Sequence, residues 1–428
     1  MNRTRSRDTE GVTVAQESDD PLTLGQLSVW RDIERMPPDR SWEGNLSTAC
    51  PVPPSISAHG VWAAVRALAE RHESLRTVYD LRASGMRQRV LPVADVMGAV
   101  RRSEITVAER AELEARELRR GFYLASEPSW RAWLVMANGR PHELLVVIHH
   151  IAADGMAIGV LERDFQVLLA CGRLDPGPQP RQLAAQQHSR RQEAALAAAE
   201  AYWRRTLIGA GPVTAPPVPR GEVVRADLHT GVPAEAAQQI AARLRISLPS
   251  LLLAVYAHAL AITFKRESLL LYPMSSNRFD PAYSNLVSSL NQWVPVLFSP
   301  DGRPFPQRAA SLHWRSFKAL KYGCYNPDAI AAIRAELARD GLMPPPGWHF
   351  TFLPAPLDGR SATEWTAPSV EWITPARSTG PAFYLVANAY PAVTLRMRVI
   401  RADFGREELA TFLDVMGDQI SAVFSPNC

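Results

Sequence analysis

Residues 142–165, HELLVVIHHIAADGMAIGVLERDF, contain the pattern that decides the fold. The apolar run LLVVI ends at His149 and His150, and a helix-like pattern begins just after Gly155. A short apolar run predicts a buried strand, and apolar residues at helical spacing predict a helix after it. Two imidazoles and the carboxylate of Asp154 therefore lie in a loop between a strand and a helix.

The composition is that of a globular protein large enough for more than one core. The chain has 428 residues, of which 46% are apolar and 21% are charged, with a formal charge of +4. This length predicts two or three domains, or one large pseudo-duplicated fold. No dense block of Lys and Arg with aromatic residues appears, which argues against nucleic-acid binding.

Cysteines and apolar runs give the expected compartment. The four cysteines are scattered, so we expect neither a disulfide framework nor a zinc site, and a reducing cytoplasm fits. Residues 1–20 lack an apolar core and are predicted to be a disordered lead-in rather than a secretory signal. No apolar run reaches the roughly 18 residues of a membrane span, so no membrane association is expected.

Both halves of the chain alternate between helical and strand patterns, which predicts an α/β fold of two mixed lobes. We place an N-terminal lobe at 21–175, a connecting helix and linker at 176–220 and a C-terminal lobe at 221–428. A long helix is expected at about 182–207, followed by the Pro- and Gly-rich linker at 209–224. Two hairpins are also expected: 76–81 with 87–93, and a second hairpin that turns at Asn138-Gly139.

The adjacent histidines can share neither one face nor one metal ion. Neighbouring side chains of a strand point to opposite faces, so only one imidazole can face a given cleft and the other makes structural hydrogen bonds. No third ligand lies at metal-binding spacing, so no metal site is expected. An imidazole can take a proton from an attacking amine or alcohol, or hold that nucleophile in place. No nucleophile elbow is present, so no covalent acyl-enzyme is indicated.

From about residue 21 to 424 the sequence resembles the condensation domain of nonribosomal peptide synthetases. Four stretches carry the resemblance: LTLGQLSVW at 22–30, RHESLRTVY at 71–79, IHHIAADG at 148–155, which contains HHxxxDG, and YPMSSNRFDPAYSNLVSSLNQWVPV at 272–296. The resemblance implies two chloramphenicol-acetyltransferase-like lobes arranged as a V-shaped pseudo-dimer around a central channel.

The resemblance also assigns roles to the residues of the opening stretch. It implies that His150 is the catalytic-centre residue and that His149 is an anchor. Asp154 would not be a base but would form a salt bridge, for which Arg278 is the expected partner. Gly155 would let the loop pack tightly beside the channel.

The chain departs from the family pattern at residues 288–293, SSLNQW. Ser288 stands where the family has a glycine, and Asn291 or Gln292 stands near its asparagine. We expect these two amides to be candidates for the channel wall. No carrier segment follows in the sequence, so the resemblance implies a free-standing, monomeric enzyme without a bound cofactor. Its donor would arrive on the phosphopantetheine arm of a partner carrier protein, and its acceptor would be a small molecule or carrier-bound.

Four functions remain open at this point: amide-forming condensation, ester formation at the same site, a CoA-dependent acyltransferase with HxxxD chemistry, and a non-catalytic carrier-docking module. The acyltransferases also carry DFGWG, of which only Asp403-Phe404-Gly405 is present, and Asp403 fits a helix N-cap. The retained second histidine favours an enzyme. The sequence names neither the acyl donor nor the acceptor.

Other conspicuous side chains are expected to be structural. His72 fits a helix end and Arg76 a brace within the same lobe. Trp203 and Trp348 are expected in the core. Four histidines have no motif support: His188, His258, His313 and His349.

Overall fold

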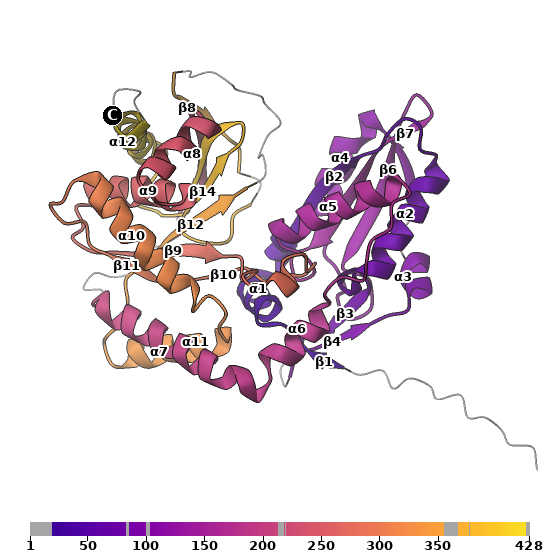
Figure 1. Cartoon of the computed structure of the whole chain (residues 1–428), viewed down its shortest axis with the longest axis horizontal. Helices are drawn as coiled ribbons and strands as arrows, with labels where there is room; N and C mark the ends of the chain where they lie inside the picture. Colours follow the sequence, from indigo (N-terminus) through magenta and orange to yellow (C-terminus); the bar gives the residue numbers. More distant parts are fainter. Residues whose placement is uncertain are drawn as a thin grey trace, which may run out of the picture.

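The computed structural model describes residues 19–82, 85–99, 103–212, 218, 220–354, 367–375 and 377–424. Residues 1–18 of the lead-in predicted at 1–20, and residues 213–217 and 219 of the predicted linker, lie outside these residues, whereas Asp20 belongs to a short strand. Two mixed bodies of helices and sheet diverge from a common base (Figure 1). The predicted α/β fold class is confirmed.

The sheet of the N-terminal lobe is buried on both faces. Its strands run in the order β2 (Asn45–Pro51), β7 (Arg140–His149), β6 (Trp130–Ala137) and β5 (Ser103–Thr106). Helices α2 (Ala58–Arg71) and α5 (Gly155–Leu169) cover one face, and α4 (Val107–Leu118) covers the other. This double burial explains the apolar run before the histidines: Leu144 and Ile148 face α2 and α5, whereas Leu145 and Val147 face α4.

Both predicted hairpins are confirmed. Strands β6 and β7 pair through a turn in which Asn138 and Gly139 have φ of 51° and 72°. The left-handed region suits these two residue types. Strands β3 (Thr77–Asp80) and β4 (Arg87–Val90) pair antiparallel, and β1 (Asp20–Pro21) adds to β4. The remaining short elements of this lobe are α1 (Leu24–Glu34), η1 (Pro38–Gly44), η2 (Glu73–Arg76) and α3 (Val93–Ala99).

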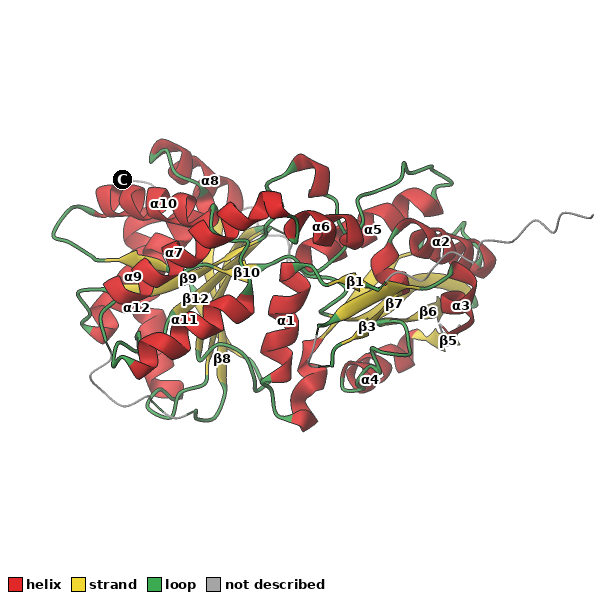
Figure 2. Ribbon diagram, turned by 90° about the horizontal axis from the view of Figure 1, so that it is seen from below, coloured by secondary structure: helices red, strands yellow, loops and turns green. Residues whose placement is uncertain are grey.

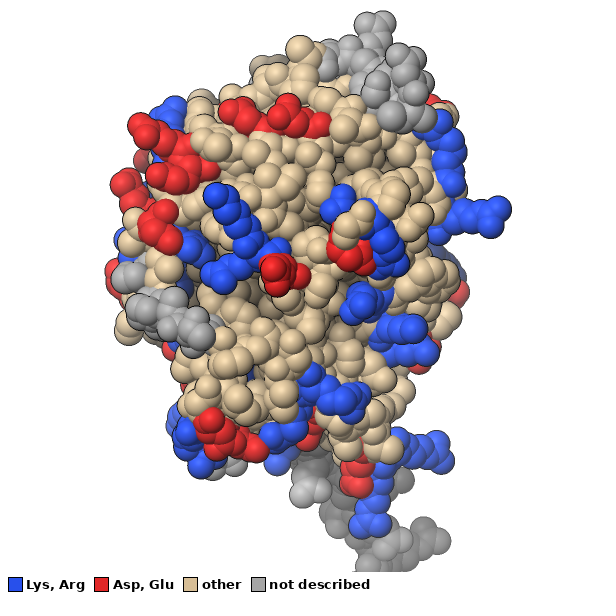
Figure 3. Space-filling view, turned by 90° about the vertical axis from the view of Figure 1, so that its left-hand side faces the viewer, with Lys and Arg blue, Asp and Glu red and all other residues tan. Residues whose placement is uncertain are grey.

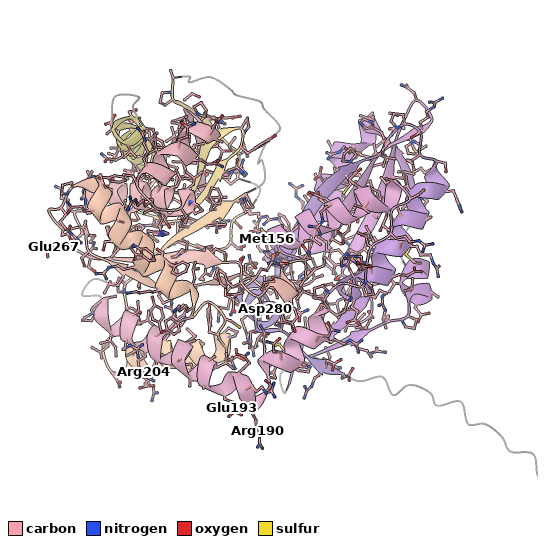
Figure 4. All side chains as sticks on the ribbon, viewed as in Figure 1. Met156, Arg190, Glu193, Arg204, Glu267 and Asp280 are labelled. Carbon is pink, nitrogen blue, oxygen red and sulfur yellow. The ribbon has the colours of Figure 1, made fainter. Side chains whose placement is uncertain are left out.

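The connection between the lobes is two helices rather than one. The prediction of a single helix at 182–207 is wrong, since α6 (Pro180–Gln187) and α7 (Glu193–Gly209) are separated by a break that includes η3 (Arg190–Gln192). Two hydrogen bonds accompany the break. The Ser189 hydroxyl donates to the nearby Gln186 carbonyl, and the His188 ring donates to the carbonyl of Leu22, far away in sequence, at 2.9 Å. Figure 4 marks the break at Arg190 and the course of α7 at Glu193 and Arg204.

The C-terminal lobe is built on an eight-stranded sheet. Its order is β10 (Gln292–Trp293), β9 (Leu269–Ser275), β12 (Trp348–Leu353), β14 (Phe383–Ala389), β15 (Ala392–Val399), β8 (Val224–Pro233) and β13 (Ser369–Trp372), and β11 (Val296–Phe298) pairs with β9. Its helices are α8 (Ala234–Arg243), α9 (Leu248–Phe264), α10 (Phe305–Leu320), α11 (Pro327–Arg339) and α12 (Arg406–Phe424), with η4 (Pro281–Tyr283) in a loop. The outer face of this lobe carries charges of both signs (Figure 3).

The two faces of this sheet differ in character. Phe350, Leu385 and Met397 lie side by side in the core beneath α9 and α12. Their neighbours His349, Tyr384 and Arg398 form a polar row on the opposite face. Among the described residues, no single helix is long and apolar enough to cross a membrane, and only the bent pair α8–α9 meets the length and composition criteria.

One loop of the second half reaches into the first. The two large cores are separate in sequence, at 22–169 and 226–424, except that Val287 belongs to the N-terminal core. Figure 2 shows α1 and α6 lying between the two sheets. The loop between β9 and β10, which carries Val287, therefore joins the lobes at the level of the histidines.

Candidate active site

His149 is an anchor within the N-terminal lobe. It is the last residue of β7 and lies on the same face as Val147, with its ring edge-on to Phe122 at 6.1 Å. Its Nδ1 accepts the backbone N–H of Ile151 at 3.2 Å. Burial, with a smaller contribution from His150, lowers the pKa of His149 to about 3. The ring is thus neutral and held in the turn that follows the strand.

His150 lies one residue beyond the strand, where the chain turns towards the other lobe. Its backbone N–H donates to the Gly44 carbonyl at 2.8 Å. Its Nδ1 lies 3.4 Å from the hydroxyl of Ser289, which comes from the second half of the chain. Burial lowers the pKa of His150, and the Arg377 guanidinium lowers it further, while Asp154 opposes the shift. A neutral imidazole can accept a proton.

Asp154 joins the two halves beside His150. Arg278 donates to its two carboxylate oxygens at 2.8 Å each, which is the pair that the family resemblance implied. The same carboxylate accepts the backbone N–H of Ala157, which caps α5, and of Leu290 at 2.9 Å each. The side chains of Asp154 and Arg278 are only 2% and 4% exposed. We call Asp154, Arg278 and the Leu290 amide the interlobe tether.

Gly155 does not pack as tightly as expected. A Cβ at this position would meet only Leu353 Cδ2, at an ordinary 3.8 Å. The residue opens α5, so a side chain there would project towards the C-terminal lobe instead of into its own loop. Met156, the next residue, is exposed and lies between the lobes (Figure 4).

The two amides of the divergent segment behave differently. Gln292 is 1% exposed, donates to the Tyr325 carbonyl at 2.9 Å and accepts from Asn277 at 3.2 Å. This corrects the expectation that it lines a channel, because both ends of its amide are used in packing β10 against the neighbouring loop. Asn291 is half-buried and accepts from the Ser289 hydroxyl at 3.3 Å. It remains a candidate for the channel wall.

Two residues near His150 were not anticipated from the sequence. Ser289 lies within the divergent segment 288–293, where only the two amides were expected at the channel wall. Arg377, whose guanidinium donates to the Asn45 carbonyl at 2.6 Å, stands in a loop without any motif. Only the fold brings residues 45, 150, 289 and 377 together, so no sequence signal could have identified Arg377.

The other conspicuous residues are structural. His72 bonds the Asp164 carboxylate at 3.0 Å, and Arg76 donates to the carbonyls of Ala69 and Leu91. Asp403 pairs with Arg401 at 2.7 Å and does not cap a helix, since α12 begins three residues later. Within the part of the chain that the structure describes, no group of three potential ligands could hold a metal ion.

A cavity of about 920 Å³ lies between the lobes. We call it the interlobe cavity. Arg31 of α1 and Arg334 of α11 line it, as do Tyr272, Trp293 and His349 from the C-terminal sheet. His150 is not among its lining residues, but Ser378 is, next in sequence to Arg377. Arg377, which lowers the pKa of His150, is therefore the sequence neighbour of a residue that lines the cavity.

The condensation-domain family model matches residues 34–313. The chain belongs to the condensation domain family. It is 29% identical over 327 residues, 70% of its length, to the isonitrile lipopeptide synthase of Mycobacterium tuberculosis. It is 34% identical over 158 residues, 37% of its length, to the probable non-canonical nonribosomal peptide synthetase CymA of Salinispora arenicola. It spans only 13% and 2% of these relatives.

The fold has close structural counterparts. A solved structure described as the molecular basis for condensation domain-mediated chain release from the enacyloxin polyketide synthase aligns with a TM-score of 0.75. The alignment covers 98% of this chain and 86% of that one at 20% identity. At this identity the likeness concerns the fold alone.

Proposed function

We propose that this chain joins an acyl group, carried as a thioester on the phosphopantetheine arm of a carrier protein, to an amine or hydroxyl acceptor. The supporting observation is His150: a neutral, half-buried imidazole at the junction of the lobes, in a chain of the condensation domain family. The proposed product is an amide, or an ester when the acceptor is an alcohol.

His150 would take the proton of the acceptor as its nitrogen or oxygen attacks the thioester carbonyl. The new C–N or C–O bond forms, the C–S bond breaks, and the carrier thiol leaves with a proton. Ser289, whose hydroxyl lies 3.4 Å from Nδ1 of His150, would orient the ring. Asp154 would fix the loop without taking part in proton transfer, since its oxygens are occupied by Arg278 and two backbone N–H groups.

The test presents one acyl group in three forms: on a carrier protein, on CoA and on a short pantetheine mimic. Intact-mass spectrometry follows the loss of acyl group from the carrier in the presence of candidate acceptors. We expect the carrier-bound donor to give the highest kcat/KM. The advantage should shrink as salt rises, because carrier proteins are usually acidic and the encounter is electrostatic.

The controls separate this proposal from its alternatives. The control for a His150→Ala variant is His59→Ala, which changes an exposed histidine of α2 and should leave turnover intact. Equal or better use of acyl-CoA without a salt effect would favour the CoA-dependent acyltransferase. Binding of acyl-carrier without any transfer, across the acceptors tried, would favour the docking module.

A further inference from the structure

The interlobe cavity has an aromatic wall made by the C-terminal sheet. Tyr272 stacks on His349 with centroids 5.0 Å apart, and Trp293 meets His349 edge-on at 4.8 Å. Trp203 lines the same space, 5.9 Å from Tyr272, so this tryptophan, expected only in the core, also borders the cavity. Pockets of roughly 300–1,000 Å³ with aromatic walls suit small molecules.

Three of the arginines that line the interlobe cavity have a carboxylate partner. Arg31 pairs with Asp328 at 2.7 Å, Arg35 with Asp32 at 3.0 Å, and Arg40 with Asp39 at 3.5 Å. The acidic lining residues Asp32 and Asp39 are thus matched by their own arginines. The positive charge of these pairs is already balanced.

Two further lining arginines have no carboxylate partner in the part of the chain that the structure describes. Arg334 donates to the Tyr272 hydroxyl at 2.6 Å, and Arg220 donates to the Gly380 carbonyl at 2.9 Å. Among the residues described, no carboxylate lies within 4 Å of either guanidinium. Burial raises the pKa of Tyr272, so its phenol is neutral and does not balance Arg334.

More positive charge lies beside the wall, on the same face of the sheet as His349. Arg398 and Arg377 also have no carboxylate within 4 Å in the described ranges, and burial lowers the pKa of both. Among the described residues, Glu43 is the carboxylate that acts on both, and it accepts from the backbone and hydroxyl groups of Ser378 and Thr379. Burial lowers the pKa of His349 to about 3, so it adds no charge of its own.

Arg334 is half-buried, and a guanidinium without a carboxylate partner keeps N–H donors that an anion can use. We propose that the interlobe cavity binds a small organic acid as the acceptor, with its carboxylate on Arg334 and its planar part against Trp293 and His349. The guanidinium fork matches a carboxylate. The role as acceptor rests on the proposed function, whereas the anion site does not.

Ligand binding tests this without turnover, so its failure is distinguishable from failure of the proposed function. Benzoate and its neutral isostere benzamide are titrated while the tryptophan fluorescence of the chain, to which Trp203 and Trp293 contribute, is followed. Benzoate should bind about tenfold or more tightly than benzamide at low salt. Trp293→Phe, which alters the wall itself, should reduce the fluorescence change.

The matched pair of variants lies on one helix. Arg334→Gln should remove the preference for benzoate, whereas Arg339→Gln, an exposed position of α11, should retain it. Arg334→Lys keeps the charge but not the fork and should retain part of the preference. Thermal melting shows whether each variant is folded. If Arg334→Gln does not fold, two comparisons still show whether Arg334 forms an anion site. One compares benzoate with benzamide, and the other compares the wild type with Arg334→Lys.

Two outcomes overturn the proposal. Equal binding of benzoate and benzamide to the wild-type chain would mean that no anion site exists. The second concerns the phosphate of the carrier arm, tested with 4′-phosphopantetheine against pantetheine. If only the phosphate-bearing compound depends on Arg334, the anion is that of the arm and not of an acceptor acid.

Discussion

The interlobe tether and the interlobe cavity both contain an arginine, but the hydrogen bonding of the two arginines differs. In the interlobe tether, Arg278 has both oxygens of Asp154 and the carbonyls of Ser276, Leu286 and Ser288 as acceptors. In the interlobe cavity, Arg334 makes one hydrogen bond within the described residues, to a neutral phenol, and its guanidinium lies over the rings of Trp203 and Tyr272. An arginine whose two terminal nitrogens both have acceptors holds two parts of a fold together, whereas one with a single acceptor has donors left for a ligand. His150 stands between the two regions and belongs to neither.

The largest expected effect is on turnover. His150→Ala should lower kcat by about 10²–10⁴ if the ring acts as a base, and by less if it only positions the acceptor. The free energy of unfolding should be unchanged, because the tether remains intact. Initial rates and a denaturant titration measure the two quantities. Full activity in this variant would remove His150 from the mechanism.

The tether itself is tested by removing its carboxylate. Asp154→Ala should destabilise the chain by about 3–5 kcal/mol, because the Arg278 charge is left buried without a partner. Removing Arg278 as well should recover part of this loss. Unfolding of the two single variants and the double variant measures the coupling. Additive effects would show that the pair contributes no energy of its own.

The close approach of α1 to the same loop is the next test. A Cβ at Gly25 would overlap the Ser289 carbonyl and the Leu290 backbone. Gly25→Ala should therefore destabilise by about 1–3 kcal/mol. Gly98→Ala is the matched control, since nothing lies within 4 Å of a Cβ there and alanine favours a helix by about 0.5–1 kcal/mol. Melting curves that move in the same direction for both would contradict this packing.

The smallest expected effect is on the pH profile. Because the pKa of His150 is lowered from 6.5, the ring stays neutral as pH falls below that value, and kcat/KM should decline only at lower pH. Arg377→Gln removes a charge that lowers this pKa, so the acid limb should move to higher pH. Arg339→Gln should leave it in place. An unchanged limb in Arg377→Gln would show that another group controls the profile.

Sequence patterns predicted the features of the fold that depend on residues adjacent in the chain. Alternation along β7 separates His149 from His150, and the turn at Asn138-Gly139 follows from residues that tolerate positive φ. The break at His188–Gln192 was missed because a helical pattern continues through it, and a contact with Leu22, far away in sequence, helps to hold it. The pairing of Asp154 with Arg278 came from a family resemblance, since 124 residues separate them.

The sequence by itself determined the strand–loop–helix unit, the mixed α/β class and the family, because periodicity, turn residues and motifs are properties of adjacent positions. Only the tertiary structure decided that Gln292 is buried, that Ser289 and Arg377 approach His150, and that Arg334 lines a cavity with no carboxylate of the described residues within 4 Å of its guanidinium. The physical reason is that burial and charge balance depend on which distant segments pack together. Whether a charge has a partner depends on distances in space, which cannot be read from the separation of two residues along the chain.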